Sequence, residues 1–270
     1  MCIRDSYYEI QYMATEYIEY LAIAREMARE AGEIQLRYFR SAHLEMHTKL
    51  NVKDVVTAAD KACETHIKSM IHSRFPTHGI IAEESGEENA DNEWRWVIDP
   101  LDGTTNFSQG YPMFCCSIAL EHNGEPVVGV VYVPYLGELF EAVKGKGAKL
   151  NGKPIHCSTK GDLATAVLAT GMPYDRNDNP DNNLTETARM IPLARAVRLD
   201  GSAAMDLCYV AAGFYDAYWE LNLKHWDVAA GRLIACEAGA VVKDIRHNRN
   251  YSVLASGPRL LATVEQLLLN

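Results

Sequence analysis

The chain has 270 residues, of which 48% are hydrophobic and 23% are charged, as is typical of a folded globular protein. Its formal net charge of −10 argues against nucleic acid or an anionic membrane as the main partner, because both attract basic surfaces. No apolar run reaches the roughly 18 residues of a membrane span. Without a signal-like N-terminus, we expect a cytoplasmic protein, and the seven scattered cysteines indicate reduced thiols.

Helical periodicity comes first along the chain. Residues 1–6 fit no pattern and enter no functional prediction. Apolar side chains recur every three or four positions over 17–38, which predicts an amphipathic helix, and again over about 57–74. After Pro76, short β-branched or aromatic runs separated by Gly, Pro and Asn predict five strands. These runs cover residues 79–83, 94–99, 114–120, 127–133 and 138–143.

The last third alternates between strand and helix patterns. Two turns, GKGA and NGKPI, precede a strand predicted near 166–170. Further strands are expected at 197–199, 214–219 and 241–243, and helices at 202–212, 226–238 and 260–269. This order predicts a layered sandwich of helices and sheets in one compact unit. We expect a region over residues 7–150 that carries the metal-binding motifs and a region over 151–270 that completes the site.

The segment WVIDPLDGTTNF, residues 96–107, is the most informative in the chain. An apolar strand ends in two aspartates, Asp99 and Asp102, three positions apart, and the turn between them aims both carboxylates the same way. Gly103 permits close backbone approach, and the following threonines could cap a helix whose N–H groups suit a phosphate. Either aspartate alone is equally compatible with a polar turn, but the whole segment is not.

Two further acidic positions follow apolar runs. Glu83 closes the run GIIA, and Asp227 lies in HWDVAAG, in the first turn of a predicted helix. Alone, Glu83 could be a solvated loop carboxylate, and Asp227 could complement the helix dipole. Together with Asp99 and Asp102 they provide oxygen ligands without thiolate or imidazole, a set that suits Mg²⁺ rather than Zn²⁺.

These residues match a known family. The chain resembles inositol monophosphatases, especially bacterial-type members, from about residue 17 to the end. The matching motifs are KLNVKDVVTAAD, IIAEESG, WVIDPLDGTTNF, GSAAMDLCYVAAGFYDAYWE and HWDVAAG. The resemblance implies an α+β fold, the layered α-β-α-β-α sandwich of the sugar phosphatases, a homodimer, and a lithium-sensitive phosphatase that uses two or three Mg²⁺ ions per active site on a small polyol or sugar phosphate.

The resemblance also implies a role for each matching residue. Glu83, Asp99 and the Leu101 carbonyl would hold the first Mg²⁺. Asp99, Asp102 and Asp227 would hold the second, and Glu83 would reach a third, weaker ion through waters. Asp60 and Thr104 would orient and deprotonate the attacking water, with Gly103 and Thr104 donating backbone N–H groups to the phosphate. The remaining substrate positions would be Lys49, Gly201, Ser202, Ala203 and Glu220.

Some positions have another interpretation or depart from the family pattern. Thr57 and Asp60 also form a plausible helix-start pair, and Lys49 and Glu220, taken singly, could be surface charges. Asp200 precedes the GSAA motif where small or neutral residues are common, and Gly239–Ala240 replaces a typical Gly–Gly pair. Neither departure affects a predicted metal ligand, but Asp200 could alter the substrate side.

Other functions remain open from the sequence. Relatives with the same metal motifs act on histidinol phosphate, fructose bisphosphate or 3′-phosphoadenosine nucleotides, and a mainly non-catalytic regulatory protein is a further alternative. A haloacid-type phosphatase would have its aspartates two apart, with the first as nucleophile. A two-carboxylate glycosidase would need neither metal nor the Gly-Thr-Thr turn.

Overall fold

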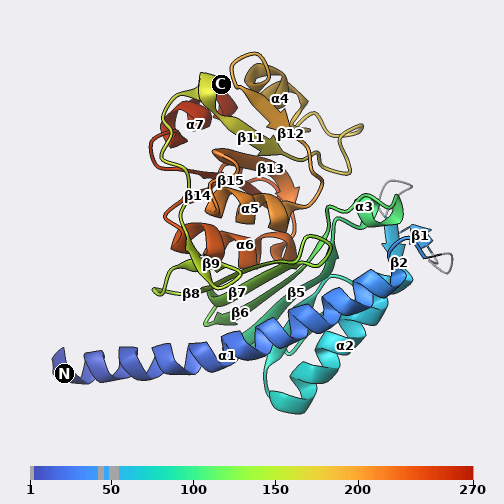
Figure 1. Cartoon of the computed structure of the whole chain (residues 1–270), viewed down its shortest axis with the longest axis vertical. Helices are drawn as coiled ribbons and strands as arrows, with labels where there is room; N and C mark the ends of the chain where they lie inside the picture. The colour runs from blue at the N-terminus through green and yellow to red at the C-terminus, as the bar shows by residue number, and fades with distance from the viewer. Residues whose placement is uncertain (1–2, 42–45, 49–54, 270) are drawn as a thin grey trace.

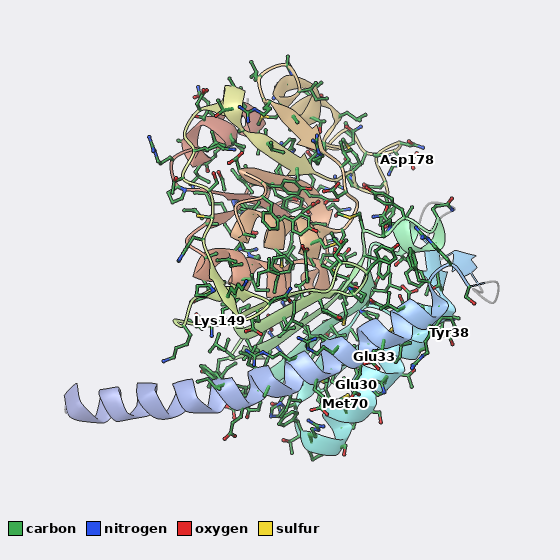
Figure 2. The ribbon with its side chains drawn as sticks, viewed as in Figure 1. Glu30, Glu33, Tyr38, Met70, Lys149 and Asp178 are labelled. Atoms are coloured by element: carbon green, nitrogen blue, oxygen red, sulfur yellow. The ribbon has the colours of Figure 1, made fainter. Side chains whose placement is uncertain are left out.

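The computed structural model of the protein describes residues 3–41, 46–48 and 55–269. It arranges them in five layers, in the order helix, sheet, helix, sheet, helix (Figure 1). Side chains fill the spaces between the layers (Figure 2). The predicted α-β-α-β-α sandwich is therefore confirmed.

The outer helical layer consists of α1 (Ile3–Tyr38) and α2 (Ala58–Arg74). The apolar face predicted for 17–38 packs against the large sheet, with Ala24, Ala28 and Ala31 fully buried. Helix α1 begins at Ile3, well before the predicted start near Tyr17. Helix α2 begins as predicted, because Thr57 and Asp60 form a capping box at its N-terminus.

The large sheet has eight strands in the order β10-β9-β8-β7-β6-β5-β3-β4. Its strands are β3 (Gly79–Ala82), β4 (Gly86–Glu88), β5 (Trp94–Asp102), β6 (Cys115–His122), β7 (Glu125–Val133), β8 (Glu138–Val143), β9 (Ala148–Leu150) and β10 (Lys153–Ile155). A separate pair, β1 (Met46–Thr48) and β2 (Val55–Thr57), is antiparallel. All five strands predicted between residues 79 and 143 are present. Five short strands, β1, β2, β4, β9 and β10, were missed because each has only three residues, too few for a period of two to emerge.

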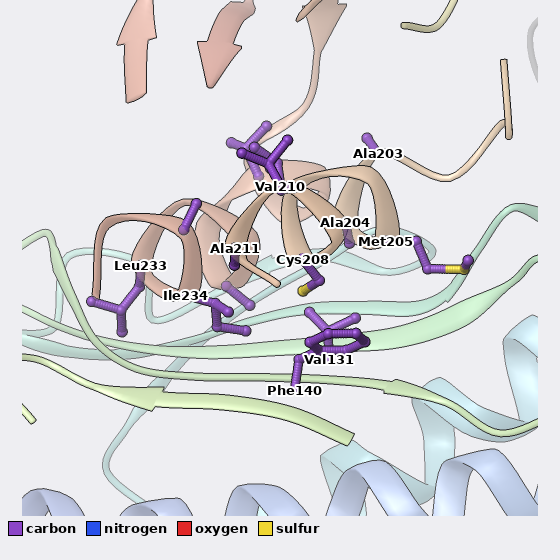
Figure 3. Packing of buried hydrophobic residues seen from close by; sticks show 14 of the residues in the cluster. Val131, Phe140, Ala203, Ala204, Met205, Cys208, Val210, Ala211, Leu233 and Ile234 are labelled. Atoms are coloured by element: carbon purple, nitrogen blue, oxygen red, sulfur yellow. The ribbon is translucent and has the colours of Figure 1, made fainter. Parts of the chain in front are cut away.

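The central layer is made of α5 (Ala203–Ala211) and α6 (His225–Glu237), which lie between the two sheets. Every residue of α5 is buried. Cys208 lies on the side of α5 toward Val131 and Phe140 of the large sheet, while Val210 points the other way (Figure 3). A helix that is mostly apolar and buried on all sides is expected where both faces are covered.

The smaller sheet has five strands in the order β12-β11-β13-β15-β14. They are β11 (Val167–Thr170), β12 (Ala196–Arg198), β13 (Ala217–Leu223), β14 (Val241–Asp244) and β15 (Tyr251–Ser256). The outer layer contains α4 (Leu184–Met190) and α7 (Leu261–Leu269), and a 3₁₀ turn, η1 (Leu163–Thr165), precedes β11. Strand β15 and helix α4 were not predicted.

The strand predicted at 214–219 is wrong in its bounds. Phe214 is half exposed, in a bend, and β13 starts at Ala217 and continues to Leu223. The aromatic Phe214 moved the predicted start of the strand three residues too early, and the predicted end at Trp219 came four residues too early. The correction matters because Glu220 lies inside a strand rather than after it.

Three general predictions concern the chain as a whole. No helix among the described residues is long and apolar enough to cross a membrane. The cysteines of the described segments are all free thiols, most of them buried, as predicted. The division into regions 7–150 and 151–270 stays a prediction.

Candidate active site

Glu83 and Asp99 lie side by side because their strands are parallel neighbours. Strand β3 pairs with β5 with Ala82 opposite Ile98, and the Glu83 N–H donates to the Ile98 carbonyl at 3.2 Å. The two carboxylates therefore lie close together, with Glu83 directly after β3 and Asp99 inside β5. Asp99 is almost fully buried, and its carboxyl group shares a hydrogen bond with that of Glu83.

Strand β5 continues past its predicted end at Asp99 to Asp102. Its pairing with β6 shifts register between these two residues, and Pro100 lies in the irregularity, where its missing N–H interrupts no ladder bond. The bulge turns Asp102 toward α5, where its Oδ2 accepts from the Ser202 hydroxyl at 2.8 Å and from the Ala204 N–H at 2.7 Å. The predicted pair of aspartates thus belongs to one strand but reaches different partners.

Gly103 follows the strand with a left-handed φ of 91° and is the N-cap of α3 (Thr104–Ser108). A Cβ at this position would lie 2.8 Å from the Met113 carbonyl oxygen. Glycine is therefore required both for conformation and for space. The sequence suggested that the threonines cap the helix, and this is wrong. Gly103 is the N-cap and Thr104 is the first helical residue.

Asp227 lies in the first turn of α6, as predicted, and its Oδ2 accepts from the Lys224 N–H at 2.7 Å. Burial raises its pKa, and the neighbouring carboxylates of Asp102 and Glu83 raise it further. Residues from two strands and a helix therefore bring four carboxylates into one electrostatic unit.

The charges of this unit repel one another. Burial raises the pKa of Asp99, with further contributions from Glu83, Asp102 and Asp227. Burial also raises the pKa of Asp102, to about 6, although the hydrogen bonds from Ala204 and Ser202 oppose the shift. Four oxygen-donor side chains of this kind fit a hard divalent cation, which would relieve the repulsion.

The carboxylates are not arranged as a finished ligand set. Across the described segments, no group of three or more His, Cys, Asp or Glu side chains could hold a metal ion as they stand. Glu83 and Asp99 bond each other, while Asp102 and Asp227 bond backbone N–H groups. These bonds orient the carboxylates and leave further acceptor lone pairs on their oxygens for a cation. The metal ligands Glu83, Asp99, Leu101, Asp102 and Asp227 stay a prediction.

A hydrogen-bonded link lies beside this acidic group. The Thr104 hydroxyl lies 3.0 Å from both Asp60 Oδ1 and the Leu101 carbonyl oxygen, and can donate to either. Asp60 is fully buried, and its Oδ2 accepts from the Thr57 N–H at 2.9 Å and from the Thr57 hydroxyl at 2.5 Å. Both interpretations of Asp60 are thus compatible with its position, since one oxygen caps α2 and the other contacts Thr104.

The predicted substrate residues come from the turn before α5 and from β13. Gly201 has a left-handed φ of 74°, Ser202 bonds Asp102, and Ala203 is buried at the start of α5. Glu220 is half-buried and accepts from the Tyr218 hydroxyl at 2.7 Å. Burial raises the pKa of Glu220 to about 7; the Tyr218 bond opposes that shift and Asp102 adds to it.

One predicted residue cannot be placed, and two residues near the site were not predicted. Lys49 lies outside the described residues. Asp206 was not selected, yet it is buried on α5, neither of its carboxylate oxygens has a hydrogen-bond partner, and burial and the charges of Asp200 and Glu220 raise its pKa. Tyr218 was also missed. Its position two residues before Glu220 would have indicated a shared face, had β13 been bounded correctly.

Residues 16–268 match the model of the inositol monophosphatase family. The chain belongs to this family. Family membership supports phosphatase activity, and it accounts for the occurrence of all five sequence motifs in one chain.

Individual relatives agree with this assignment. The chain is 44% identical over 231 residues to the inositol-1-monophosphatase of Synechocystis, covering 85% of this chain and 77% of that protein. It is 43% identical over 251 residues to the Nus factor SuhB of Vibrio cholerae, covering 91% and 94%. The solved inositol monophosphatase of Anabaena shares 41% identity with a TM-score of 0.84, covering 93% and 95%.

Proposed function

We propose that the protein is a Mg²⁺-dependent phosphomonoesterase that hydrolyses myo-inositol monophosphate or a similar small polyol or sugar phosphate. The observation that carries this proposal is the contact of Thr104 with Asp60 and Leu101, beside four mutually repelling carboxylates. A proton acceptor and a cation-binding group are thus adjacent, as hydrolysis of a phosphate ester by water requires.

Two or three Mg²⁺ ions would be held by the carboxylates of Glu83, Asp99, Asp102 and Asp227 and by the Leu101 carbonyl. When bound, the ions supply positive charge that polarises the phosphate and lowers the pKa of water. The Asp102 and Asp227 carboxylates are oriented by backbone N–H groups at the starts of α5 and α6, which limits their freedom before any cation binds.

Asp60 and Thr104 would handle the proton of the attacking water. Thr104 can donate its hydroxyl proton to Asp60 Oδ1, which leaves the hydroxyl oxygen free to accept from a water molecule. The water oxygen forms a bond to phosphorus, and the water proton passes through Thr104 toward Asp60. The ester P–O bond breaks with its electron pair on the alcohol oxygen, which takes up a proton from solvent. The backbone N–H groups of Gly103 and Thr104 would bind the phosphate oxygens.

The alcohol part of the substrate would contact Gly201, Ser202, Ala203 and Glu220. A carboxylate offers two acceptor oxygens to a vicinal diol, so Glu220 favours a polyol leaving group. Histidinol phosphate, fructose bisphosphate and 3′-phosphoadenosine nucleotides are the alternatives within the same chemistry. By family resemblance, we also expect a homodimer and inhibition by Li⁺.

A panel assay tests this proposal. Phosphate release is measured with and without Mg²⁺ from inositol monophosphate, the three alternatives and p-nitrophenyl phosphate. We expect the highest kcat/KM for inositol monophosphate, and no turnover after chelation. If only p-nitrophenyl phosphate were hydrolysed, the result would support phosphatase activity and contradict the assignment of a polyol phosphate as substrate.

A second role, as a Nus factor, is favoured by the identity of 41% over 246 residues to the Nus factor SuhB of Escherichia coli K12. The test is complementation of an E. coli strain that lacks that protein, by this chain and by its Asp102→Asn variant. Complementation by both would separate the second role from catalysis, and complementation by neither would exclude it.

A further inference from the structure

Gly171 directly follows β11 and lies against the carboxyl group of Glu220. A Cβ atom at Gly171 would lie 2.0 Å from Glu220 Oε2 and 2.2 Å from both Cδ and Oε1. We propose that Gly171 and Tyr218 are positioning residues that hold the Glu220 carboxylate in place for the alcohol part of the substrate. This inference rests on the proposed function, because it deepens the role given there to Glu220.

Glycine is needed at position 171 because there is no space for a Cβ atom, and not because of the backbone conformation. Its φ is not in the left-handed region, in contrast to Gly103 and Gly201 nearby. Any L-residue could adopt this backbone conformation. The three heavy atoms nearest to an added Cβ all belong to the Glu220 carboxyl group, which occupies the volume where a Cβ would stand.

The backbone of Gly171 cannot easily retreat from Glu220. The Asn183 side-chain amide donates to the Gly171 carbonyl at 2.6 Å and lies 2.7 Å from the Thr170 hydroxyl. Asn183 Oδ1 accepts from the Trp219 indole at 2.6 Å, and the Thr170 hydroxyl donates to the Trp219 carbonyl at 2.7 Å.

These bonds are buried and join β11 to β13. In the parallel register Thr170 is opposite Trp219, so the next residues along, Gly171 and Glu220, are neighbours. Since breaking buried hydrogen bonds leaves unpaired polar groups, the strands should stay together. An added methyl group at Gly171 would consequently displace the Glu220 carboxylate.

Tyr218 fixes Glu220 from a second direction. The two residues are on the same face of β13, and the Tyr218 hydroxyl donates to Glu220 Oε2 at 2.7 Å. The Tyr218 side chain is fully buried, so its hydroxyl has little freedom to follow a displaced carboxylate. Space at Gly171 and a hydrogen bond from Tyr218 together define one position for the carboxylate.

The decisive variant is Gly171→Ala, measured on inositol monophosphate and on p-nitrophenyl phosphate. We expect kcat/KM to fall roughly 10- to 100-fold on the polyol phosphate, and less than about threefold on p-nitrophenyl phosphate, which has no hydroxyl groups to bind. Gly161→Ala is the matched control. Gly161 also has no left-handed φ, and its nearest neighbour to an added Cβ would be Arg259 at an ordinary 3.5 Å. That variant should behave like the wild type on both substrates.

A double-mutant cycle identifies Glu220 as the group through which Gly171 acts. Gly171→Ala combined with Glu220→Gln should lose no more than the larger single loss, because both changes remove one interaction. Tyr218→Phe, which keeps the buried ring, should lose roughly 3- to 10-fold on the polyol phosphate alone. The proposal would be overturned if the loss in kcat/KM of the double variant equalled the product of the two single losses, or if each variant lost as much on p-nitrophenyl phosphate as on the polyol phosphate.

A crystal structure of Gly171→Ala provides a measurement without substrate. It should show the Glu220 carboxylate displaced and its bond to Tyr218 broken, with Asn183 still bonded to residue 171. An unmoved carboxylate would overturn the proposal even if activity fell. If the wild type hydrolysed no phosphate, the proposed function would fail, and this structure would still decide whether Gly171 positions Glu220.

Discussion

The Thr104 hydroxyl lies 3.0 Å from Asp60 Oδ1, and this contact joins the turn after β5 to the first turn of α2. Both residues are buried, and they are separated by 44 positions in the chain. The same aspartate caps α2 with its other oxygen. Asp60 thus stabilises the start of α2 with one oxygen and leaves the other for Thr104. Its position is rigid because it is part of the helix cap.

Removing the Thr104 hydroxyl should slow hydrolysis without unfolding the protein. Thr104→Val keeps the shape of the side chain, but it cannot hold or relay a proton. We expect kcat to fall by roughly 10²-fold, the lower range for loss of general acid–base assistance. Thr104→Ser, which retains the hydroxyl, should keep most of the activity. Equal activity of the Val and Ser variants would exclude Thr104 from the proton path.

Asp102→Asn separates a ligand role from a structural one. It keeps the acceptor oxygen for Ser202 and Ala204 but removes one of four neighbouring charges. We expect a loss in kcat/KM of at least roughly 10²-fold, comparable to losing a major electrostatic stabiliser. Asp178→Asn, at an exposed position on the edge of the molecule (Figure 2), is the control and should be neutral. Near-normal turnover of Asp102→Asn would show that Asp102 is not a ligand.

Asp102→Asn should also show that the charge of Asp102 lowers the free energy of unfolding in a pH-dependent way. The pKa of Asp102 rises from 3.8 to about 6 in the folded state, so the folded protein binds its proton more tightly than the unfolded chain. The associated stability is present below pH 3.8 and is lost as the pH rises through about 6. Without metal, Asp102→Asn should therefore be more stable than the wild type by about 1–3 kcal/mol at pH 8.

Urea unfolding in the presence of a chelator measures this difference. At pH 5 the two proteins should be closer in stability than at pH 8, because most of the Asp102 carboxyl group is then neutral. Added Mg²⁺ should stabilise the wild type more than the variant at pH 8. A stability difference that is independent of pH would mean that Asp102 carries its charge in the folded protein at no cost.

Metal removal tests the whole carboxylate group at once. Exhaustive chelation should abolish turnover, and Mg²⁺ should restore it, because four repelling carboxylates need a cation to act together. Excess Ca²⁺ should inhibit, since its looser and larger coordination shell misplaces the reacting water. Turnover by the chelated protein would contradict both the ligand assignment and the proposed reaction.

Much of the fold and of the candidate site was predictable because the signals are local. The apolar face of α1 follows from its spacing of three and four, and the Thr57–Asp60 helix start follows from adjacent residues. The carboxylates Glu83 and Asp99 each end an apolar run, and this pattern places Glu83 directly after β3, whereas β5 continues past Asp99 to Asp102. Where the pattern was too short, as in β9 and β10, prediction failed.

The sequence by itself determined which residues are the candidates for the chemistry, because residue type and local spacing are written along the chain. Only the tertiary structure decided which residues position them. Gly171 directly follows β11 and Glu220 lies in β13, and these strands are neighbours through a parallel register across 49 positions of chain. No periodicity spans that distance. The contact exists because buried hydrogen bonds of Thr170 and Asn183 hold the two strands together, and such bonds form only once the sheet has assembled.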